Sequence, residues 1–285
     1  MHIEPPQHPL RRKAAKAAIM ASLRLQNQID RRPILGDAPV AVSLTSYGHR
    51  IETVSFAIES VARGSVRPRR FVLWVAEADL PLTERADLQR LSHRGLEIRT
   101  ALNYGPHTKN YPYARDHADD GLSMVTCDDD ILYPRGWLAG LVRAQAARPE
   151  HFLAYRAHEV TLDADGLAPY ASWPPATGAT LSERVFVTGV GGTVFPPRLM
   201  RHMRDAGEAF MDTCPKADDL WISLVALRTG VPAAVVPNAL KALVVPRVQQ
   251  KGSLHEGNVH GGNDAQIQAT YTDEDIEFLR AAGAP

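Results

Sequence analysis

Three consecutive carboxylates, Asp128, Asp129 and Asp130, follow the apolar run 122–127. Carboxylates this close repel one another unless a cation neutralises them. Their hard oxygens suit Mg²⁺ or Mn²⁺, and magnesium commonly takes one or two protein carboxylates and leaves its other positions to water and substrate phosphates. The triplet therefore predicts a divalent metal site; the alternative is an acidic turn in which Asp130 caps a helix.

A second acidic pair, Asp218 and Asp219, lies in the first turn of a helix predicted to run from about residue 216 to about residue 229. The helix dipole stabilises carboxylates there, and capping alone would explain one of them. Between the two acidic groups lies Gly189-Val-Gly-Gly192, which lacks the Lys-Ser/Thr of a P-loop and the spacing of a dinucleotide fingerprint. We interpret this segment as a close approach of the backbone to a ligand or as a bulge.

The elements that must position these residues alternate between strand and helix in the first half of the chain. Strands are predicted at 40–44, 71–75, 96–102 and 122–127, and helices at 51–63 and 83–92. This order implies right-handed crossovers and a largely parallel sheet, whose ligands bind outside the carboxyl ends of the strands. The polar segment 45–50 and the Asp triplet both follow strands, so we expect them at one edge of the sheet.

The second half is less regular. We expect a helix after the triplet, a strand at 152–155, an Asp-Gly hairpin within 160–167, a loop at 168–184, one strand over 185–195, a helix from about 197 and a strand at 242–245.

The first 33 residues carry seven Lys or Arg against two acidic residues. A helix is predicted over 10–29, with Leu10, Ala14, Ala17, Ala18, Ala21 and Leu25 near one face. Two interpretations stay open: contact with an anionic membrane surface, and packing on the domain or on a second subunit.

The composition of this 285-residue chain, 45% hydrophobic and 22% charged, is typical of a soluble protein with one large domain or two small ones. A balance of 32 basic and 32 acidic residues argues against a nucleic-acid partner bound through global positive charge. Two cysteines are too few for a disulfide framework or a zinc site. With no signal-like or membrane-spanning apolar run, we expect a cytoplasmic protein, with peripheral contact at the inner face of the membrane through residues 1–33 as an open option.

In this order and at these spacings, Val125–Ile131, Gly189–Gly192 and Lys216–Asp219 resemble the motifs of GT-A glycosyltransferases, the fold of the large inverting family that includes cellulose and chitin synthases. The resemblance covers residues 40 to about 265. It implies an α/β fold with a nucleotide-binding, mostly parallel sheet flanked by helices and a mixed acceptor-side half. The implied organisation is a basic helical extension and linker (1–39), a glycosyltransferase domain (40–268, with a donor half at about 40–133 and an acceptor half at about 134–268) and a C-terminal helix (269–285).

The function implied by the resemblance is metal-dependent transfer of a sugar from a nucleotide-sugar donor, with UDP-sugars as first choice, to a hydroxyl of a glycan or lipid-linked acceptor in bacterial-type surface polysaccharide synthesis. The nucleotide-sugar site would comprise Thr45, Ser46, Tyr47, Asp128 and Asp129. In the Asp-X-Asp motif, Asp130 would bind Mn²⁺ or Mg²⁺ directly, and Asp128 would meet the ribose or a metal-bound water. Asp219 matches the catalytic base of the inverting enzymes, with Asp218 as the open alternative.

Transfer of a sugar from a nucleotide donor requires similar residue types on chemical grounds alone. Release of a nucleoside diphosphate needs positive charge, which a metal, Arg50 and Lys109 would supply. The second strand ends near Glu77 and Asp79, which stand where the family has its base-recognising Asp, so the identity of the nucleotide stays open.

Further contacts are predicted outside this core set. Gly191 and Gly192 would approach the acceptor or sugar, and Trp173 and Trp221 would stack on sugar faces unless they pack in the core. The polar tail 251–264 would fold over the donor, with His260 or His255 as an additional metal ligand, since imidazole suits Mn²⁺ better than Mg²⁺. An exposed loop with incidental histidines is the alternative.

Three other functions are weighed against this one. A sugar nucleotidyltransferase would need a Gly-rich loop with a Lys after the first strand, which the sequence lacks, and a haloacid-dehalogenase-like phosphohydrolase would carry its Asp motif near its start. A catalytically silent glycan- or nucleotide-binding module on the same fold stays possible. Oligomeric state and stereochemical outcome are left open.

Overall fold

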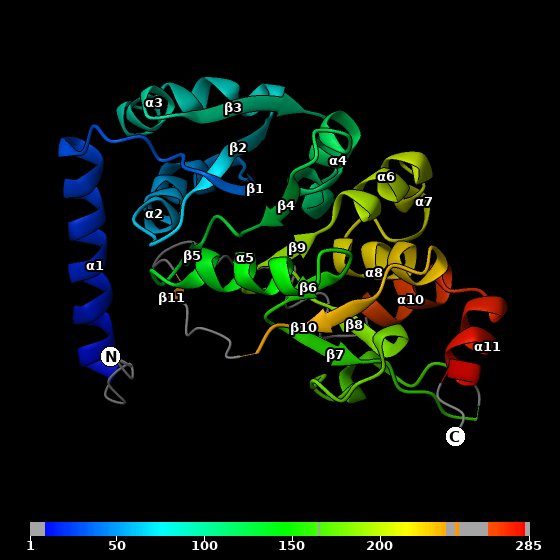
Figure 1. Cartoon of the computed structure of the whole chain (residues 1–285). Helices are drawn as coiled ribbons and strands as arrows, with labels where there is room; N and C mark the ends of the chain where they lie inside the picture. The colour runs from blue at the N-terminus through cyan, green and yellow to red at the C-terminus, as the bar shows by residue number, and fades with distance from the viewer. Residues whose placement is uncertain (1–8, 165, 238–242, 245–261, 283–285) are drawn as a thin grey trace.

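The computed structural model describes residues 9–164, 166–237, 243–244 and 262–282, and its centre is a seven-stranded sheet (Figure 1). The strand order is β10-β6-β9-β4-β1-β2-β3. Strand β9 runs antiparallel to both of its neighbours, and the other pairings are parallel. The predicted α/β fold with a mostly parallel sheet is therefore confirmed. The bounds are β1 Ala38–Thr45, β2 Pro68–Ala76, β3 Leu96–Ala101, β4 Ser123–Thr126, β6 Phe152–Ala154, β9 Thr193–Phe195 and β10 Ala233–Val235.

Helices cover both faces of this sheet, because alternate strand residues point to opposite sides. On β1, Val40, Val42 and Leu44 belong to a core shared with α2, α3 and α5, whereas Ala41 belongs to a second core shared with α4, α6 and α8. The helices are α2 Ile51–Ala62, α3 Ala86–His93, α4 Tyr111–His117, α5 Trp137–Ala147, α6 Pro197–Ala206, α7 Phe210–Thr213 and α8 Asp218–Arg228.

The segment 185–195 corrects the sequence prediction of a single strand. It divides into β8 Val185–Val187, which pairs with β7 Ala157–Glu159, and β9, which enters the central sheet. Gly191 and Gly192 between them have φ of 90° and 108°, a region that glycine occupies without strain, so the chain can turn sharply there. Strand β10 was not predicted.

The remaining small elements complete the second half. The expected hairpin within 160–167 is present as an antiparallel bridge between Leu162 and Leu167. Strand β5 Ile131–Leu132 pairs antiparallel with β11 Leu243–Val244, the described part of the strand expected at 242–245. The C-terminal helix expected at 269–285 corresponds to α11 Asp273–Ala282, which begins later than expected because Thr272 and Asp275 exchange the hydrogen bonds of a capping box at its start. Helix α10 Asn263–Thr270 precedes it and was not predicted.

The N-terminal helix α1, Pro9–Ile29, packs against α2 and α3 with a different face from the one predicted. Leu23 is fully buried against Phe56, whereas Leu25 of the predicted apolar face is 55% exposed. The sequence pattern misled because a polar residue belongs to the buried face: Asn27 donates to Glu59 and to the carbonyl of Asp87. No helix among the described residues combines the length and apolarity needed to cross a bilayer.

Candidate functional site

The two polar strand-end segments meet at the carboxyl edge of the sheet. Strands β1 and β4 are parallel neighbours with Ser43 opposite Thr126, so the residues that follow them lie side by side. Ser46 Oγ donates to Asp129 Oδ2 at 2.7 Å, and Arg50 donates to both carboxylate oxygens of Asp129. These contacts confirm the prediction that the two segments lie at one edge of the sheet.

Asp129 organises this edge instead of facing a ligand. It is 5% exposed, and its oxygens are taken by Ser46 and by the guanidinium of Arg50. Arg50 Nη2 also lies 3.3 Å from Asp130 Oδ2. The structure therefore directs Arg50 to carboxylates of its own site, although the sequence had assigned it to a substrate diphosphate.

Asp128 and Asp130, on either side, remain accessible, since each side chain is 25% exposed. Burial raises the pKa of Asp128 to about 6, although the nearby Lys109 opposes this shift. Burial also raises the pKa of Asp130 against the opposing effect of Arg50. Two carboxylates that remain partly destabilised in their charged forms suit a divalent cation, which would favour ionisation of both.

The donor set fits part of a metal site. Hard carboxylate oxygens suit Mg²⁺ or Mn²⁺, and these ions accept water and substrate oxygens in their remaining positions. Within the part of the chain that the structure describes, no three His, Cys, Asp or Glu side chains converge to hold a metal. His255 and His260, the predicted additional ligands, lie outside the described residues.

Lys109 connects this group with the second acidic pair. Its Nζ lies 3.5 Å from Asp128 Oδ1 and 3.3 Å from Asp218 Oδ2, with the side chain only 13% exposed. Its backbone carbonyl accepts a 2.6 Å hydrogen bond from Ser43 Oγ on β1, which fixes the turn that carries it. Burial would lower the pKa of Lys109, but Asp218, Asp128 and Asp219 outweigh this and hold it above its ordinary value.

The two members of the second acidic pair have different surroundings. Asp218 is buried, and its Oδ2 accepts from Asn110 Nδ2 at 3.0 Å and faces Lys109. Asp219 Oδ1 accepts only from the Gly189 N–H, at 2.8 Å, among the hydrogen bonds of the described residues. Burial and the adjacent Asp218 raise the pKa of Asp219 to about 7. Asp219 can therefore exchange a proton near neutral pH.

Gly189 has a steric reason to be glycine. A Cβ there would lie 3.1 Å from both Asp219 Oδ1 and Lys109 Nζ. The close backbone approach inferred from the sequence is thus an approach to the acidic site itself. The next glycines serve the turn: Gly191 O accepts from Trp137 Nε1 at 2.6 Å, and a Cβ on Gly192 would lie 2.7 Å from the same indole.

The remaining predicted residues divide between surface and core. Tyr47 is 51% exposed with its ring centroid 5.6 Å from the guanidinium carbon of Arg50, and Thr45 Oγ1 donates to the Trp74 carbonyl. Trp173 and Trp221 are 3% and 8% exposed. Both indoles pack inside the fold, which argues against the expectation that they stack on sugars.

Sequence reasoning missed Asn110 and Tyr133. Asn110 follows Lys109 directly and holds Asp218. The Asp128 N–H donates to the Tyr133 hydroxyl at 2.8 Å, and the Tyr133 N–H donates to Ser60 Oγ at 2.9 Å, so the triplet is tied to α2. Neither residue belongs to a recognisable motif. Their closeness in sequence to Lys109 and to the Asp triplet is the one feature that could have indicated a role in the site.

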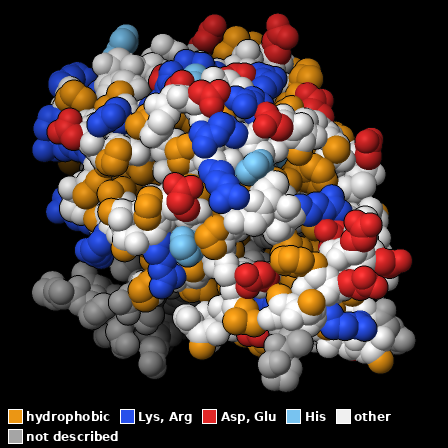
Figure 2. All heavy atoms as spheres, turned by 45° about the vertical axis from the view of Figure 1, so that its right-hand side comes forward, with side chains coloured by type: hydrophobic (Ala, Val, Ile, Leu, Met, Phe, Trp, Pro, Cys, Tyr) orange, Lys and Arg blue, Asp and Glu red, His pale blue; other side chains and the backbone are white. Residues whose placement is uncertain are grey.

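On the face shown in Figure 2, acidic, basic and apolar side chains are interspersed. Cavities of about 230 and 380 Å³ both lie against α1, and the acidic site residues line neither of them.

No protein-family model and no curated protein sequence matches this chain. Solved structures do. A mannosyltransferase from Pyrobaculum calidifontis in complex with GDP-Man and Mn²⁺ is 14% identical, with a TM-score of 0.52 over 94% of this chain and 78% of that one. Two others score lower. They are a 4-diphosphocytidyl-2C-methyl-D-erythritol synthase from Anaerococcus prevotii (11% identical, 88% of this chain, 98% of that one, TM-score 0.46) and an inositol-1-phosphate CTP transferase from T. maritima (14% identical, 88% and 99%, TM-score 0.44).

At this level of identity the likeness concerns the fold alone. These structures do not show the resemblance to cellulose and chitin synthases that the sequence motifs suggested. The central sheet, its flanking helices and the likeness to the mannosyltransferase structure together make this a GT-A-like α/β fold.

Proposed function

We propose that the protein is a glycosyltransferase that uses a nucleotide-sugar donor and a divalent metal to glycosylate a hydroxyl of a glycan or lipid-linked acceptor. One observation carries the proposal. The Lys109 ammonium lies between Asp128 and Asp218, and therefore joins the carboxylates suited to a metal with the acidic pair that contains Asp219, the carboxylate suited to a base. Such a continuous site at the carboxyl edge of a mostly parallel sheet is where this fold class binds ligands.

On the donor side, Asp130 and Asp128 would hold Mn²⁺ or Mg²⁺, which would neutralise charge on the departing diphosphate. The mannosyltransferase with the similar fold was solved with GDP-Man and Mn²⁺, which supports a donor and a metal of this kind. Asp129 keeps the triplet in place through Arg50 and Ser46. The exposed ring of Tyr47, beside Arg50, is available to the base or ribose.

On the acceptor side, Asp219 removes the proton from the attacking hydroxyl. The hydroxyl oxygen forms a bond to the anomeric carbon as the bond from that carbon to the phosphate oxygen breaks, and the proton ends on the Asp219 carboxylate. The Gly189 N–H orients this carboxylate. A base whose pKa lies near the working pH combines ionisation with useful proton affinity. Direct displacement of this kind inverts the anomeric configuration.

The test begins with nucleotide binding by the full chain. Thermal-shift titrations with UDP, GDP and CDP, with and without MnCl₂, identify the nucleotide, and hydrolysis and transfer assays with the matching sugar nucleotides follow. We expect Asp130→Ala to lose metal-dependent nucleotide binding and turnover while its melting temperature stays near that of the wild type, because Asp130 is partly exposed. Asp212→Ala, which removes an exposed carboxylate on α7, is the matched control.

Each other outcome has a clear meaning. Turnover by Asp130→Ala in the presence of EDTA would contradict the metal assignment. Pyrophosphate release from a nucleoside triphosphate and a sugar phosphate, without sugar transfer, would identify a nucleotidyltransferase. Nucleotide binding with neither transfer nor hydrolysis of any donor would identify a silent binding module.

A further inference from the structure

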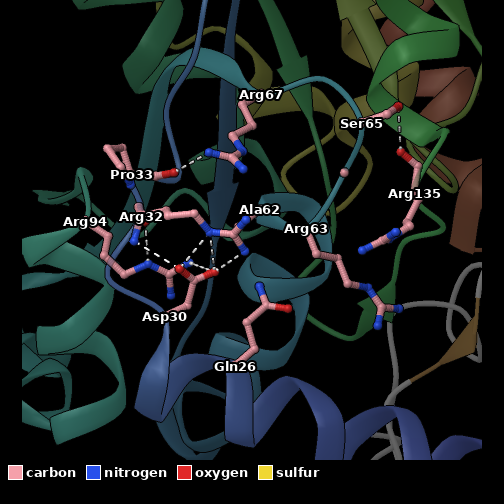
Figure 3. Close-up of a pocket in the computed structure, with 11 residues that line it drawn as sticks. Gln26, Asp30, Arg32, Pro33, Ala62, Arg63, Ser65, Arg67, Arg94 and Arg135 are labelled. Atoms are coloured by element: carbon pink, nitrogen blue, oxygen red, sulfur yellow. Dashed lines mark hydrogen bonds and ion pairs between the residues drawn. The ribbon is translucent and has the colours of Figure 1, made fainter.

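Five arginines line a cavity of about 230 Å³ beside the C-terminal end of α1 (Figure 3). No described residue of the carboxylate site lines this cavity. They come from separate parts of the chain: the linker after α1, the end of α2 and the loop that follows it, the end of α3, and the turn before α5. Asp30 is the one carboxylate among the lining residues. The arginines are Arg32, Arg63, Arg67, Arg94 and Arg135.

Part of this positive charge is already compensated. Arg32 forms an ion pair with Asp30 at 2.7 Å, and Arg94 pairs with the buried Glu59. Arg67 donates to the Pro33 carbonyl at 2.9 Å, a contact that leaves its charge uncompensated. These bonds hold the linker that follows α1 and join the end of α3 to α2, so they are structural.

Arg63 and Arg135 differ from Arg32 and Arg94 because no ion pair with a carboxylate is found for either within the described residues, and they differ from Arg67 because no hydrogen bond of their guanidiniums is found there. The Arg63 Nε is buried and lacks a hydrogen-bond partner there. Figure 3 shows the two side chains extending toward each other. Burial first, and then the charge of Arg135, lowers the pKa of Arg63. An unpaired buried donor and two like charges in proximity are both unfavourable.

A structural explanation covers only part of this arrangement. Arg63 stands at the C-cap of α2, where the helix dipole favours a cation. The dipole does not satisfy the Nε donor, and it gives no reason for Arg135 to approach. The turns that carry the two residues are fastened together, since the Ser65 N–H donates to the Arg135 carbonyl at 2.9 Å. The backbone thus holds the two turns that carry these guanidiniums next to each other.

We propose that this cavity binds a phosphate-bearing anion, a phosphomonoester or diphosphate group, through Arg63 and Arg135. Planar guanidinium groups bind phosphate oxygens in pairs of parallel hydrogen bonds. The cavity is smaller than the roughly 300–1,000 Å³ of sites that enclose whole drug-sized ligands, which favours a phosphate group over a complete nucleotide sugar. The group can belong to a soluble phosphate compound or to a lipid headgroup.

The proposal is independent of glycosyl transfer and is tested on the full chain with EDTA present, so that the carboxylate site holds no metal. Sodium pyrophosphate is titrated by calorimetry at low ionic strength. We expect Arg63→Gln/Arg135→Gln to bind it at least about tenfold more weakly than the wild type, as loss of charged hydrogen bonds predicts. The matched control Arg143→Gln/Arg201→Gln removes two exposed arginines on α5 and α6 and should bind like the wild type.

A second arm distinguishes the two sources of the group. The wild type and both double variants are sedimented with vesicles containing phosphatidic acid, a phosphomonoester, or phosphatidylglycerol, a diester. Loss of phosphatidic-acid binding in Arg63→Gln/Arg135→Gln alone identifies a lipid headgroup, whereas a loss confined to pyrophosphate identifies a soluble ligand. Equal behaviour of the wild type and this variant toward both probes overturns the proposal.

Folding of the variants is checked by circular dichroism. If the double variant is unfolded, the single variant Arg135→Gln replaces it, because Arg135 is exposed and its side chain has no ion pair within the described residues. Wild-type affinity of Arg135→Gln for both probes would then overturn the proposal. Asp130→Ala should retain wild-type affinity for pyrophosphate under these conditions, which separates this cavity from the carboxylate site.

Discussion

Replacing Lys109 by methionine tests whether one ammonium holds the acidic site together. Methionine keeps most of the side-chain volume and removes the charge. Asp128 and Asp218 then lose the cation that lies 3.5 and 3.3 Å from them. The neighbouring Asp219 also loses a charge that opposes the rise of its pKa.

The expected cost follows from burial. Removing one partner of a buried ion pair typically destabilises a protein by about 3–5 kcal/mol. Asp218 is almost fully buried, but Asp128 is a quarter exposed and can be partly solvated, so the lower end of this range, about 3 kcal/mol, applies. At about 2–4 °C per kcal/mol for a chain of this size, the melting temperature should fall by about 6–12 °C.

The loss should depend on pH in a defined direction. Without Lys109, the pKa of Asp128 rises further above its unfolded value of about 4. A carboxyl whose pKa is higher in the folded than in the unfolded state does not lower the free energy of unfolding below the unfolded pKa. Its destabilising effect grows as pH rises from the unfolded to the folded pKa, and it is constant above the folded pKa. The difference in melting temperature between the wild type and Lys109→Met should therefore be larger at pH 8 than at pH 5.

Calorimetric or fluorescence melting at both pH values provides the measurement. Lys216→Met, the same substitution at an exposed lysine close to α8, is the control and should change stability little. An equal loss at pH 5 and pH 8 would mean that Lys109 contributes packing instead of charge. Wild-type stability of Lys109→Met at pH 8 would refute the bridging role.

Other substitutions test separate features. Asp219→Asn should reduce the rate of sugar transfer by at least about 10²-fold with donor affinity nearly unchanged. The transfer rate of the wild type should rise with pH up to about 7, because burial and Asp218 raise the pKa of this base to about 7. A larger loss of transfer in Asp218→Asn would assign the base to Asp218. Gly192→Ala should destabilise by about 1–3 kcal/mol in chemical denaturation, because its Cβ would meet Trp137 at a φ of 108°. Gly178→Ala, with open space around it, should be neutral, and equal stability of the two variants would contradict the packing argument.

The sheet and the position of the triplet could be predicted from the sequence because both follow from local patterns. Four apolar runs in the first half became parallel strands, and the Asp triplet followed one of them to the carboxyl edge. The prediction of one strand over 185–195 was wrong because apolar character alone does not reveal a turn. The two strands of this segment belong to different sheets, and the turn between them contains Gly191 and Gly192, which have positive φ.

The partners within the site could not be predicted, because they depend on tertiary contacts. The sequence predicted that Lys109 and Arg50 bind a substrate phosphate, but each forms ion pairs with carboxylates from distant parts of the sequence. Trp173 and Trp221 read as candidate platforms, and packing decided their burial. Periodicity likewise could not reveal that Asn27, a polar residue, lies on the buried face of α1.

The contacts of Lys109 also constrain the order in which the protein can assemble. During synthesis, β1 to β4 and Lys109 leave the ribosome well before α8, so Asp128 is then the only one of its two carboxylate partners present. Closing so long a loop of chain is entropically slow. Lys109 can therefore neutralise Asp218 only when α8 docks against the sheet that is made before it. A chain that ends before α8 would leave Lys109 with Asp128 as its ion-pair partner, where the finished protein adds Asp218.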